Sequence, residues 1–127
     1  MRTAYEYAPP QPLVLLVGRD PVEQLRIRVT LEREGFCVLR TTVDELSSVL
    51  RIVTPALILV DVEAASDPLA LVRSVRRGAS GETRVVAMTG DPTVGSTLME
   101  SRRHCTGVVA KPLDLRSLGR RMAELVG

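Results

Sequence analysis

The chain has 127 residues, of which 45% are hydrophobic and 25% charged, a length and balance that predict one globular domain. Its formal net charge of +2 is too small to indicate direct binding of nucleic acid. No apolar stretch approaches the roughly 20 residues of a membrane span, and the N-terminus lacks the apolar stretch of a signal peptide. We therefore expect a cytoplasmic protein with no membrane insertion. Cys37 and Cys105 fit neither a metal site nor a disulfide framework, so we expect both to be reduced and at or near the core.

Residues 1–12 are predicted to form a short, irregular N-terminal arm. Pro9, Pro10 and Pro12 lie in it, and proline interrupts both helices and strand ladders. Residues 13–127 are predicted to form the single domain.

Five short apolar runs, rich in Val, Leu and Ile, follow the arm. They are Leu13–Val17, Phe36–Leu39, Ala56–Val62, Arg84–Met88 and Gly107–Ala110. Most of them are continuous rather than alternating, which is the pattern of strands in a parallel sheet that is buried on both faces.

Stretches long enough for helices separate these runs, and a further one follows the last. Three of them begin with an Asp-Pro pair, at Asp20, Asp67 and Asp91. Aspartate caps the free N–H groups of a first helical turn, and proline suits the next position. The stretch around residues 92–103 is the weakest, because Gly95 and several Ser and Thr residues lower its helix propensity. The last stretch has the clearest apolar stripe, formed by Leu115, Leu118, Met122 and Leu125.

Five strand-then-helix units predict an α/β fold of the flavodoxin-like, doubly wound (βα)5 type. The expected sheet is parallel and five-stranded, in the order 2-1-3-4-5. In this order the winding reverses between the first and third strands, and ligands bind outside the carboxyl ends of the strands at that point.

Polar residues follow the predicted strands at this edge. The first strand runs into GRD at 18–20 and the third into DVE at 61–63. The fourth is followed by Thr89 and the fifth by Lys111. A carboxylate, a hydroxyl and an ammonium at one edge suit phosphoryl transfer to Asp61, with the other two groups holding phosphoryl oxygens.

Each of these residues also has an ordinary explanation. Asp61 alone is a common turn former, Thr89 a common loop hydroxyl, and Lys111 a common solvated charge. Their joint placement at one edge favours a site. Asp20 is different, because Pro21 follows it and an N-cap role is therefore favoured over ligand binding.

Residues 13–126 resemble the receiver domain of bacterial two-component response regulators. The segments LVLLVGRDP, EREGFCVL, PALILVDV, RVVAMTG and GVVAKPLDLRSL carry the resemblance, in this order and at the expected spacing. The resemblance implies that Asp61 is the phosphoacceptor, Thr89 the switch hydroxyl and Lys111 the phosphate contact. It also implies that the bond between Lys111 and Pro112 is cis.

One departure from the family pattern affects the metal. Receivers usually carry two adjacent acidic residues after the first strand that hold Mg²⁺, and here these positions are Gly18 and Arg19. A guanidinium there repels a divalent cation by on the order of several kcal/mol at short range. Mg²⁺ would depend on Asp61, with Glu63 and Asp20 as the remaining carboxylates. The ordinary alternative for Glu63 is a loop carboxylate that faces solvent.

A second departure is at Val108, where the family usually has an aromatic residue that changes rotamer with the switch hydroxyl. Valine has one restricted torsion and no ring to swing. The aromatic half of the usual switch is therefore absent.

Two functions remain open, both of them signalling roles rather than enzymatic turnover. In the first, a histidine kinase or phosphotransfer protein phosphorylates Asp61. The face of the fourth helix, fifth strand and fifth helix then rearranges, and this face can support a homodimer. In the second, the chain is a phosphorylation-independent pseudo-receiver that binds another protein, and Arg19 pairs with Asp61.

A small-molecule binder of the flavodoxin kind is disfavoured. No Gly-rich phosphate loop follows the first strand, and aromatic residues make up only 2% of the chain.

Overall fold

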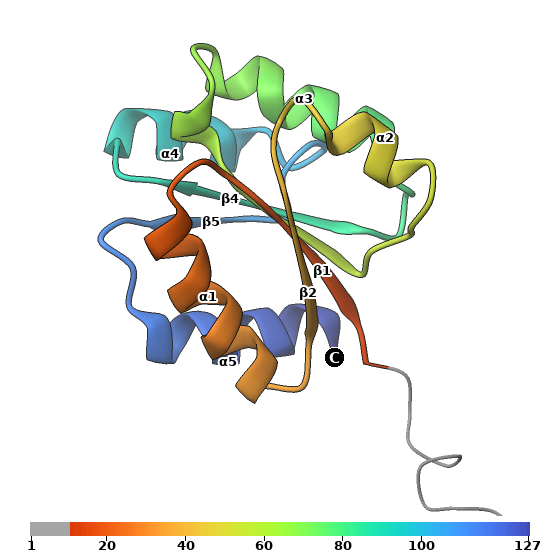
Figure 1. Cartoon of the computed structure of the whole chain (residues 1–127). Coiled ribbons are helices and arrows are strands. Elements are labelled where there is room, and N and C mark those ends of the chain that lie inside the picture. Colours follow the sequence, from red (N-terminus) through yellow and green to blue (C-terminus); the bar gives the residue numbers. More distant parts are fainter. Residues whose placement is uncertain (1–10) are drawn as a thin grey trace, which may run out of the picture.

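The computed structural model describes residues 11–127. Residues 1–10, most of the predicted arm, lie outside the described residues, and Gln11 and Pro12 have no regular structure. Strands and helices then alternate along the chain (Figure 1). The elements are β1 (Leu13–Val17), α1 (Pro21–Arg33), β2 (Cys37–Thr41), α2 (Leu46–Leu50), β3 (Leu57–Asp61), the 3-10 turn η2 (Val62–Ala64), α3 (Pro68–Gly78), β4 (Arg84–Thr89), α4 (Pro92–Glu100), β5 (Gly107–Ala110) and α5 (Leu115–Val126).

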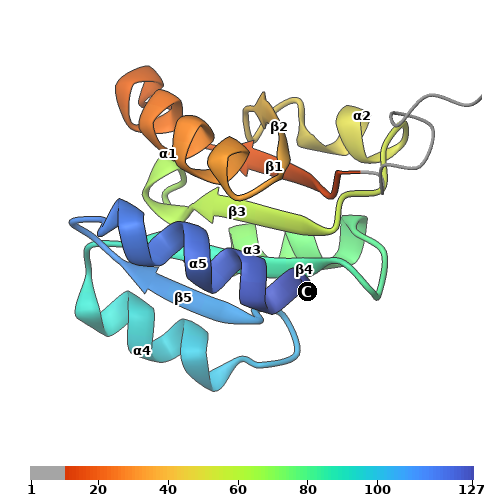
Figure 2. The ribbon, with the colours of Figure 1, turned by 90° about the horizontal axis from the view of Figure 1, so that it is seen from below.

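The five strands form one parallel sheet in the order β2-β1-β3-β4-β5, so the predicted fold class and strand order are confirmed. Helices α2, α3 and α4 cover one face, and α1 and α5 cover the other (Figures 1 and 2). The order reverses at β1, which lies between β2 and β3. Because all the strands are parallel, each connection from a strand to the following helix lies at the carboxyl edge of the sheet.

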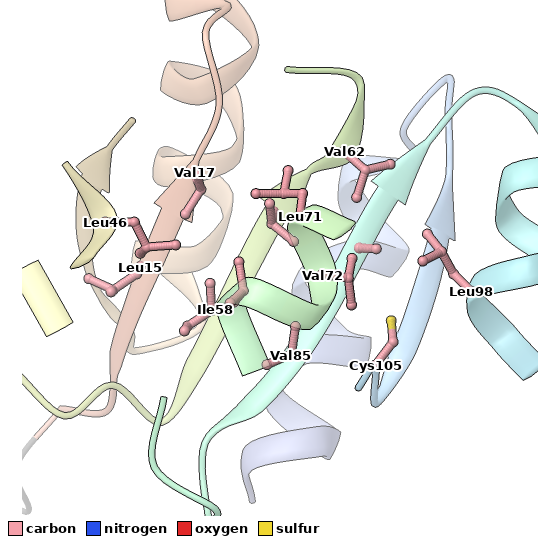
Figure 3. Packing of buried hydrophobic residues seen from close by; sticks show 13 residues of the cluster. Leu15, Val17, Leu46, Ile58, Val62, Leu71, Val72, Val85, Leu98 and Cys105 are labelled. Carbon is pink, nitrogen blue, oxygen red and sulfur yellow. The ribbon is translucent and has the colours of Figure 1, made fainter. Parts of the chain in front are cut away.

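Each face of the sheet has its own hydrophobic core, which explains the continuous apolar runs. In β3, Ile58 and Val60 pack under α2, α3 and α4, whereas Leu57 and Leu59 pack under α1 and α5. Figure 3 shows Ile58 among the residues of the first of these cores. All five residues of β3 are buried. Because successive side chains of a strand alternate between faces, a strand covered on both sides needs apolar residues at every position. This burial also fixes the backbone of Asp61, the last residue of β3.

The Asp-Pro pairs begin helices as predicted. The carboxylates of Asp20, Asp67 and Asp91 accept backbone N–H groups in the first turns of α1, α3 and α4. Asp114 caps α5 in the same way. These caps satisfy N–H groups that the helix leaves free and set where each helix begins at the edge of the sheet.

Some local expectations were wrong. Cys105 is buried as expected, but Cys37 is exposed, because β2 is an edge strand and one of its faces is poorly covered. The stretch predicted as helical around residues 92–103 stops at Glu100. Among residues 11–127, no helix has the length and apolar character to cross a membrane.

Helix α1 ends in a motif that requires glycine. Gly35 has φ of 95°, and its N–H bonds to the carbonyl of Glu32. The N–H of Phe36 reaches back to the carbonyl of Leu31, and both side chains are in the core beneath α1. This is the Schellman arrangement, in which the left-handed residue is usually glycine because a Cβ is strained there.

We expect Gly35→Ala to lower the free energy of unfolding by about 1–2 kcal/mol, because alanine is strained at positive φ. Urea denaturation followed by circular dichroism measures the change. Gly81→Ala is the matched control: Gly81 is in a turn without positive φ, and a Cβ there meets no atom within 4 Å. Equal stability of the two variants would contradict this account of the helix end.

Candidate functional site

Four of the predicted site residues come together at the carboxyl edge of the sheet. Asp61 ends β3, Thr89 ends β4, and Lys111 directly follows β5. Glu63 is in η2, immediately after β3. Pairing of β3 with β4 and of β4 with β5 brings these ends side by side. The peptide bond between Lys111 and Pro112 is cis, as the resemblance implied.

Lys111 is at the centre of this group. Its Nζ lies 2.9 Å from Oδ2 of Asp61, 3.3 Å from Oε2 of Glu63 and 3.3 Å from Oε1 of Glu23. The lysine and Asp61 side chains are only 17% and 11% exposed, so solvent screens their interaction weakly. Lys111 is also the only lysine of the chain. One ammonium therefore joins carboxylates from α1, β3 and η2.

The sequence did not indicate Glu23 as a site residue. It is three residues after Asp20 in the first turn of α1, where an acidic residue is already favoured by the helix end. One feature of the sequence could have indicated Glu23. The first turn of α1 begins at the carboxyl edge of the sheet, beside the point where the strand order reverses.

Glu63 turns its carboxylate toward the site, although 46% of its side chain remains exposed to solvent. Its Oε1 accepts the hydroxyl of Thr89 at 3.3 Å and the N–H of Gly90. Its Oε2 faces Lys111, and its own N–H bonds to Oδ1 of Asp61 at 3.0 Å. The same carboxylate therefore contacts the ends of both β4 and β5.

The turn after β1 is arranged differently from the expectation for a pseudo-receiver. Arg19 does not pair with Asp61: its guanidinium donates to the carbonyl of Ala64, and Lys111 is the ion-pair partner of Asp61. The Arg19 side chain is exposed and reaches η2, and the position beside Asp61 is taken by Lys111. Asp20 caps α1 through the N–H groups of Val22 and Glu23, at 3.0 and 3.3 Å.

Gly18 leaves a gap in the polar network beside Asp61. A Cβ at this position would lie 3.4 Å from Cβ of Asp61 and 3.4 Å from Nε2 of Gln24. Among residues 11–127, that Nε2 is the one buried side-chain polar atom without a hydrogen-bond partner. An acidic side chain in place of Gly18 would supply the missing acceptor.

Val108 is partly buried and packs against the core beneath α2, α3 and α4. A Cβ at Gly95 of α4 would lie 3.7 Å from Cγ1 of Val108 and 3.6 Å from Cγ2 of Thr89. Helix α4 thus packs closely over both residues.

The charges of the site shift the pKa values of two of its groups. The N–H of Gly90 is the main cause that lowers the pKa of Glu63 below its usual 4.5; burial opposes this, and Lys111 adds to it. Burial alone would lower the pKa of Lys111, but the hydrogen bond and charge of Asp61, helped by Glu23, raise it above the usual 10.5. Both shifts favour the charged forms.

The donor set does not fit Mg²⁺. The carboxylates of Asp61 and Glu63 face the Lys111 ammonium, Gly18 offers no donor, and Asp20 is engaged in capping. Within the part of the chain that the structure describes, no group of three acidic, His or Cys residues is placed to hold a metal ion. Octahedral Mg²⁺ needs carboxylate oxygens that face an open position, and here a protein cation takes that place.

Solved structures similar to this chain include response regulators and their receiver domains. A response regulator from Thermotoga maritima has a TM-score of 0.80 and 23% identity, over 92% of this chain and 98% of that one. The chemotaxis response regulator CheY4 of Vibrio cholerae has a TM-score of 0.78 and 18% identity, over 91% and 99%. The receiver domain of TorR, a response regulator of the TMAO respiratory system, has a TM-score of 0.77 and 25% identity, over 92% and 97%.

No protein-family model matches the sequence, and no curated protein does so. The structural likeness therefore defines the class by its fold: the chain has the CheY-like receiver fold over nearly all of its described length.

We expect Lys111→Met to lower the free energy of unfolding at pH 7 by about 2 kcal/mol, because three carboxylates would then face one another without a cation. The loss should shrink at pH 4, where carboxyl groups begin to protonate. Urea denaturation at both pH values measures it, with exposed Arg77→Met as the control. A loss at pH 7 no larger than that of the control would contradict the central role of Lys111.

The single lysine permits a direct measurement of its ionisation. With ¹³C-labelled lysine, we expect one Cε resonance that titrates above 10.5 and moves to lower pH in Asp61→Asn. Because the folded-state pKa is raised, the stabilisation by Lys111 is present below 10.5 and lost as the pH rises through the folded-state value. The pKa of Glu63 is lowered in the folded state, so the stabilisation by the Glu63 carboxylate is present above pH 4.5 and lost as the pH falls through the folded-state value. A wild-type midpoint for Lys111 at or below 10.5 would disagree with this geometry.

Proposed function

We propose that this chain is a phosphorylation-independent receiver-fold module, which signals by binding another protein and has no catalytic turnover. One observation carries the proposal: the carboxylates of the site converge on Lys111, while the turn after β1 contributes no carboxylate to the pocket. A cation of the protein itself therefore faces these carboxylates, and it offsets part of their charge.

The contacts of Asp61 support the same proposal. Its Oδ2 is bound to Lys111 and its Oδ1 accepts the N–H of Glu63. A carboxylate whose two oxygens are both engaged is stabilised as a structural anion, and this stabilisation weakens it as a nucleophile. The charge of Lys111 is already shared among three carboxylates, so little of it is left to neutralise an approaching phosphoryl group.

The face formed by α4, β5 and α5 is where we propose that the partner binds, or that a second copy forms a homodimer. Thr89 and Lys111 lead from the site directly into this face. Met99 is 46% exposed on α4, and the α5 arginines Arg116, Arg120 and Arg121 are exposed. Exposed arginines on α5 favour a protein surface with complementary acidic groups.

A second candidate is a phosphorelay receiver in which a histidine kinase or phosphotransfer protein phosphorylates Asp61. Its support is the convergence of Asp61, Thr89 and Lys111, the residues that the receiver resemblance assigned to this chemistry. It differs from the first candidate in needing a bound divalent cation.

Titration with beryllium fluoride and Mg²⁺, followed by amide NMR, separates the two. We expect no saturable shift at Thr89 or Gly90 in the wild type at millimolar Mg²⁺. In Gly18→Asp/Arg19→Asp we expect Mg²⁺ alone to bind at least about tenfold more tightly than in the wild type, because two carboxylates replace a glycine and a cation. The carboxylate introduced in place of Gly18 would also meet the unpaired amide of Gln24.

Saturable shifts of the wild type with beryllium fluoride would refute phosphorylation independence and favour the second candidate. Asp61→Asn gives an independent test in the host, where we expect signalling output equal to that of the wild type. Loss of output in this variant would also favour the second candidate.

A further inference from the structure

Three donors at the site point at one position, and the chain's own Glu63 fills it. The hydroxyl of Thr89 and the N–H of Gly90 both donate to Oε1 of Glu63. The ammonium of Lys111 lies 3.3 Å from Oε2. One side-chain hydroxyl, one backbone N–H and one cation together form a cradle for an anion, since each of them donates and none competes with the others.

The backbone around Glu63 holds its side chain in this direction. The N–H of Glu63 is bonded to Oδ1 of Asp61, so the turn η2 starts from a buried strand end. The carbonyl of Ala64, the last residue of η2, accepts the guanidinium of Arg19. Both ends of this three-residue turn are therefore bonded to neighbouring segments, which fixes the backbone position from which the Glu63 side chain extends.

Gly90 makes room for the carboxylate. A Cβ at this position would lie 3.2 Å from Oε1 of Glu63 and 3.6 Å from Cβ of Lys111. A side chain at this position would require the Glu63 carboxylate to shift by a few tenths of an ångström, away from the N–H that it accepts.

The cradle is connected to helix α4. The hydroxyl of Thr89 donates to Glu63 and accepts the N–H of Asp91 at 3.1 Å. The carboxylate of Asp91 in turn caps α4 through the N–H groups of Thr93 and Val94, at 2.9 and 3.3 Å. A continuous chain of hydrogen bonds thus runs from Glu63 to the first turn of α4.

We propose that Glu63 is a built-in ligand of this cradle: its carboxylate holds the connection between β4 and α4 in a single bound arrangement that needs no external anion. The inference rests on the proposed function and deepens it, because a site that carries its own anion explains how a receiver fold can work without phosphorylation. The relevant charged neighbours are Lys111 after β5, Asp61 in β3 and Glu23 in α1, all of which meet at the same ammonium.

Chemical rescue tests this proposal. In Glu63→Ala we expect the Gly90 amide resonance and the single Lys111 Nζ resonance to move, and the Gly90 amide to exchange with solvent about tenfold faster. Acetate, which carries the lost carboxylate, should return both resonances toward their wild-type positions in a saturable manner. Sodium chloride at the same ionic strength should not. The control is Glu82→Ala, which removes an exposed carboxylate that precedes β4, at the opposite edge of the sheet.

A second variant reaches the cradle from its other side. Gly90→Ala places a methyl group against Oε1 of Glu63, and we expect it to shift the Lys111 Nζ resonance in the same direction as Glu63→Ala. Amide spectra with wild-type dispersion show that both variants are folded.

Unchanged Gly90 and Lys111 resonances in folded Glu63→Ala would overturn the proposal, as would a response to acetate equal to that of the wild type. These outcomes are distinct from failure of the proposed function, which is a response of the wild type to beryllium fluoride with Mg²⁺. Rescue by acetate together with that response would retain Glu63 as the resident ligand and refute phosphorylation independence alone.

Discussion

The ammonium of Lys111 is the point at which three segments of the chain meet. Carboxylates from α1, β3 and η2 lie within 3.3 Å of it, and the lysine side chain is only 17% exposed. A cation this poorly hydrated is stable only if anions replace the lost water, and the carboxylates need it equally. One shared charge therefore links the connections at this edge, in addition to the hydrophobic cores beneath the helices.

This arrangement changes the chemistry available at the sheet edge. A receiver that depends on Mg²⁺ keeps carboxylates free to face a metal, whereas here Asp61 and Glu63 face a protein cation and the turn after β1 adds Gly18 and Arg19. Asp61, Thr89 and Lys111 are present at the sheet edge, but their side chains bond to Glu63 and to one another.

The fold was predictable because its signals are local and repeated. Apolar residues on both faces of most strands and Asp-Pro pairs before three helices leave few arrangements other than a doubly wound sheet. The convergence of Asp61, Thr89 and Lys111 followed from the order of the strands alone. The ion-pair partners of Lys111 could not be predicted in this way. Glu23, for example, is equally well explained as an acidic residue that stabilises the first turn of its helix.

Side-chain directions were the other part that the sequence could not provide. Both Glu63 and Arg19 are long and flexible, and a pattern of residue types does not say which of several acceptors or donors each will reach. Arg19 reaches the carbonyl of Ala64 because η2 brings that carbonyl to the edge, and η2 itself follows from the bond between Asp61 and the N–H of Glu63. These side-chain contacts depend on η2, a turn of three residues that no strong sequence pattern predicts.

The packing of α4 indicates how this site communicates with the rest of the molecule. Gly95 brings the helix close to Thr89 and Val108, and valine at the second position has no ring that could move between two places. What remains is the hydrogen-bonded path from Glu63 through Thr89 to Asp91, which ends on the first turn of α4. Each step of that path joins a side-chain oxygen to a hydroxyl or a backbone N–H, so it links the glutamate after β3 to the beginning of α4 without an aromatic ring.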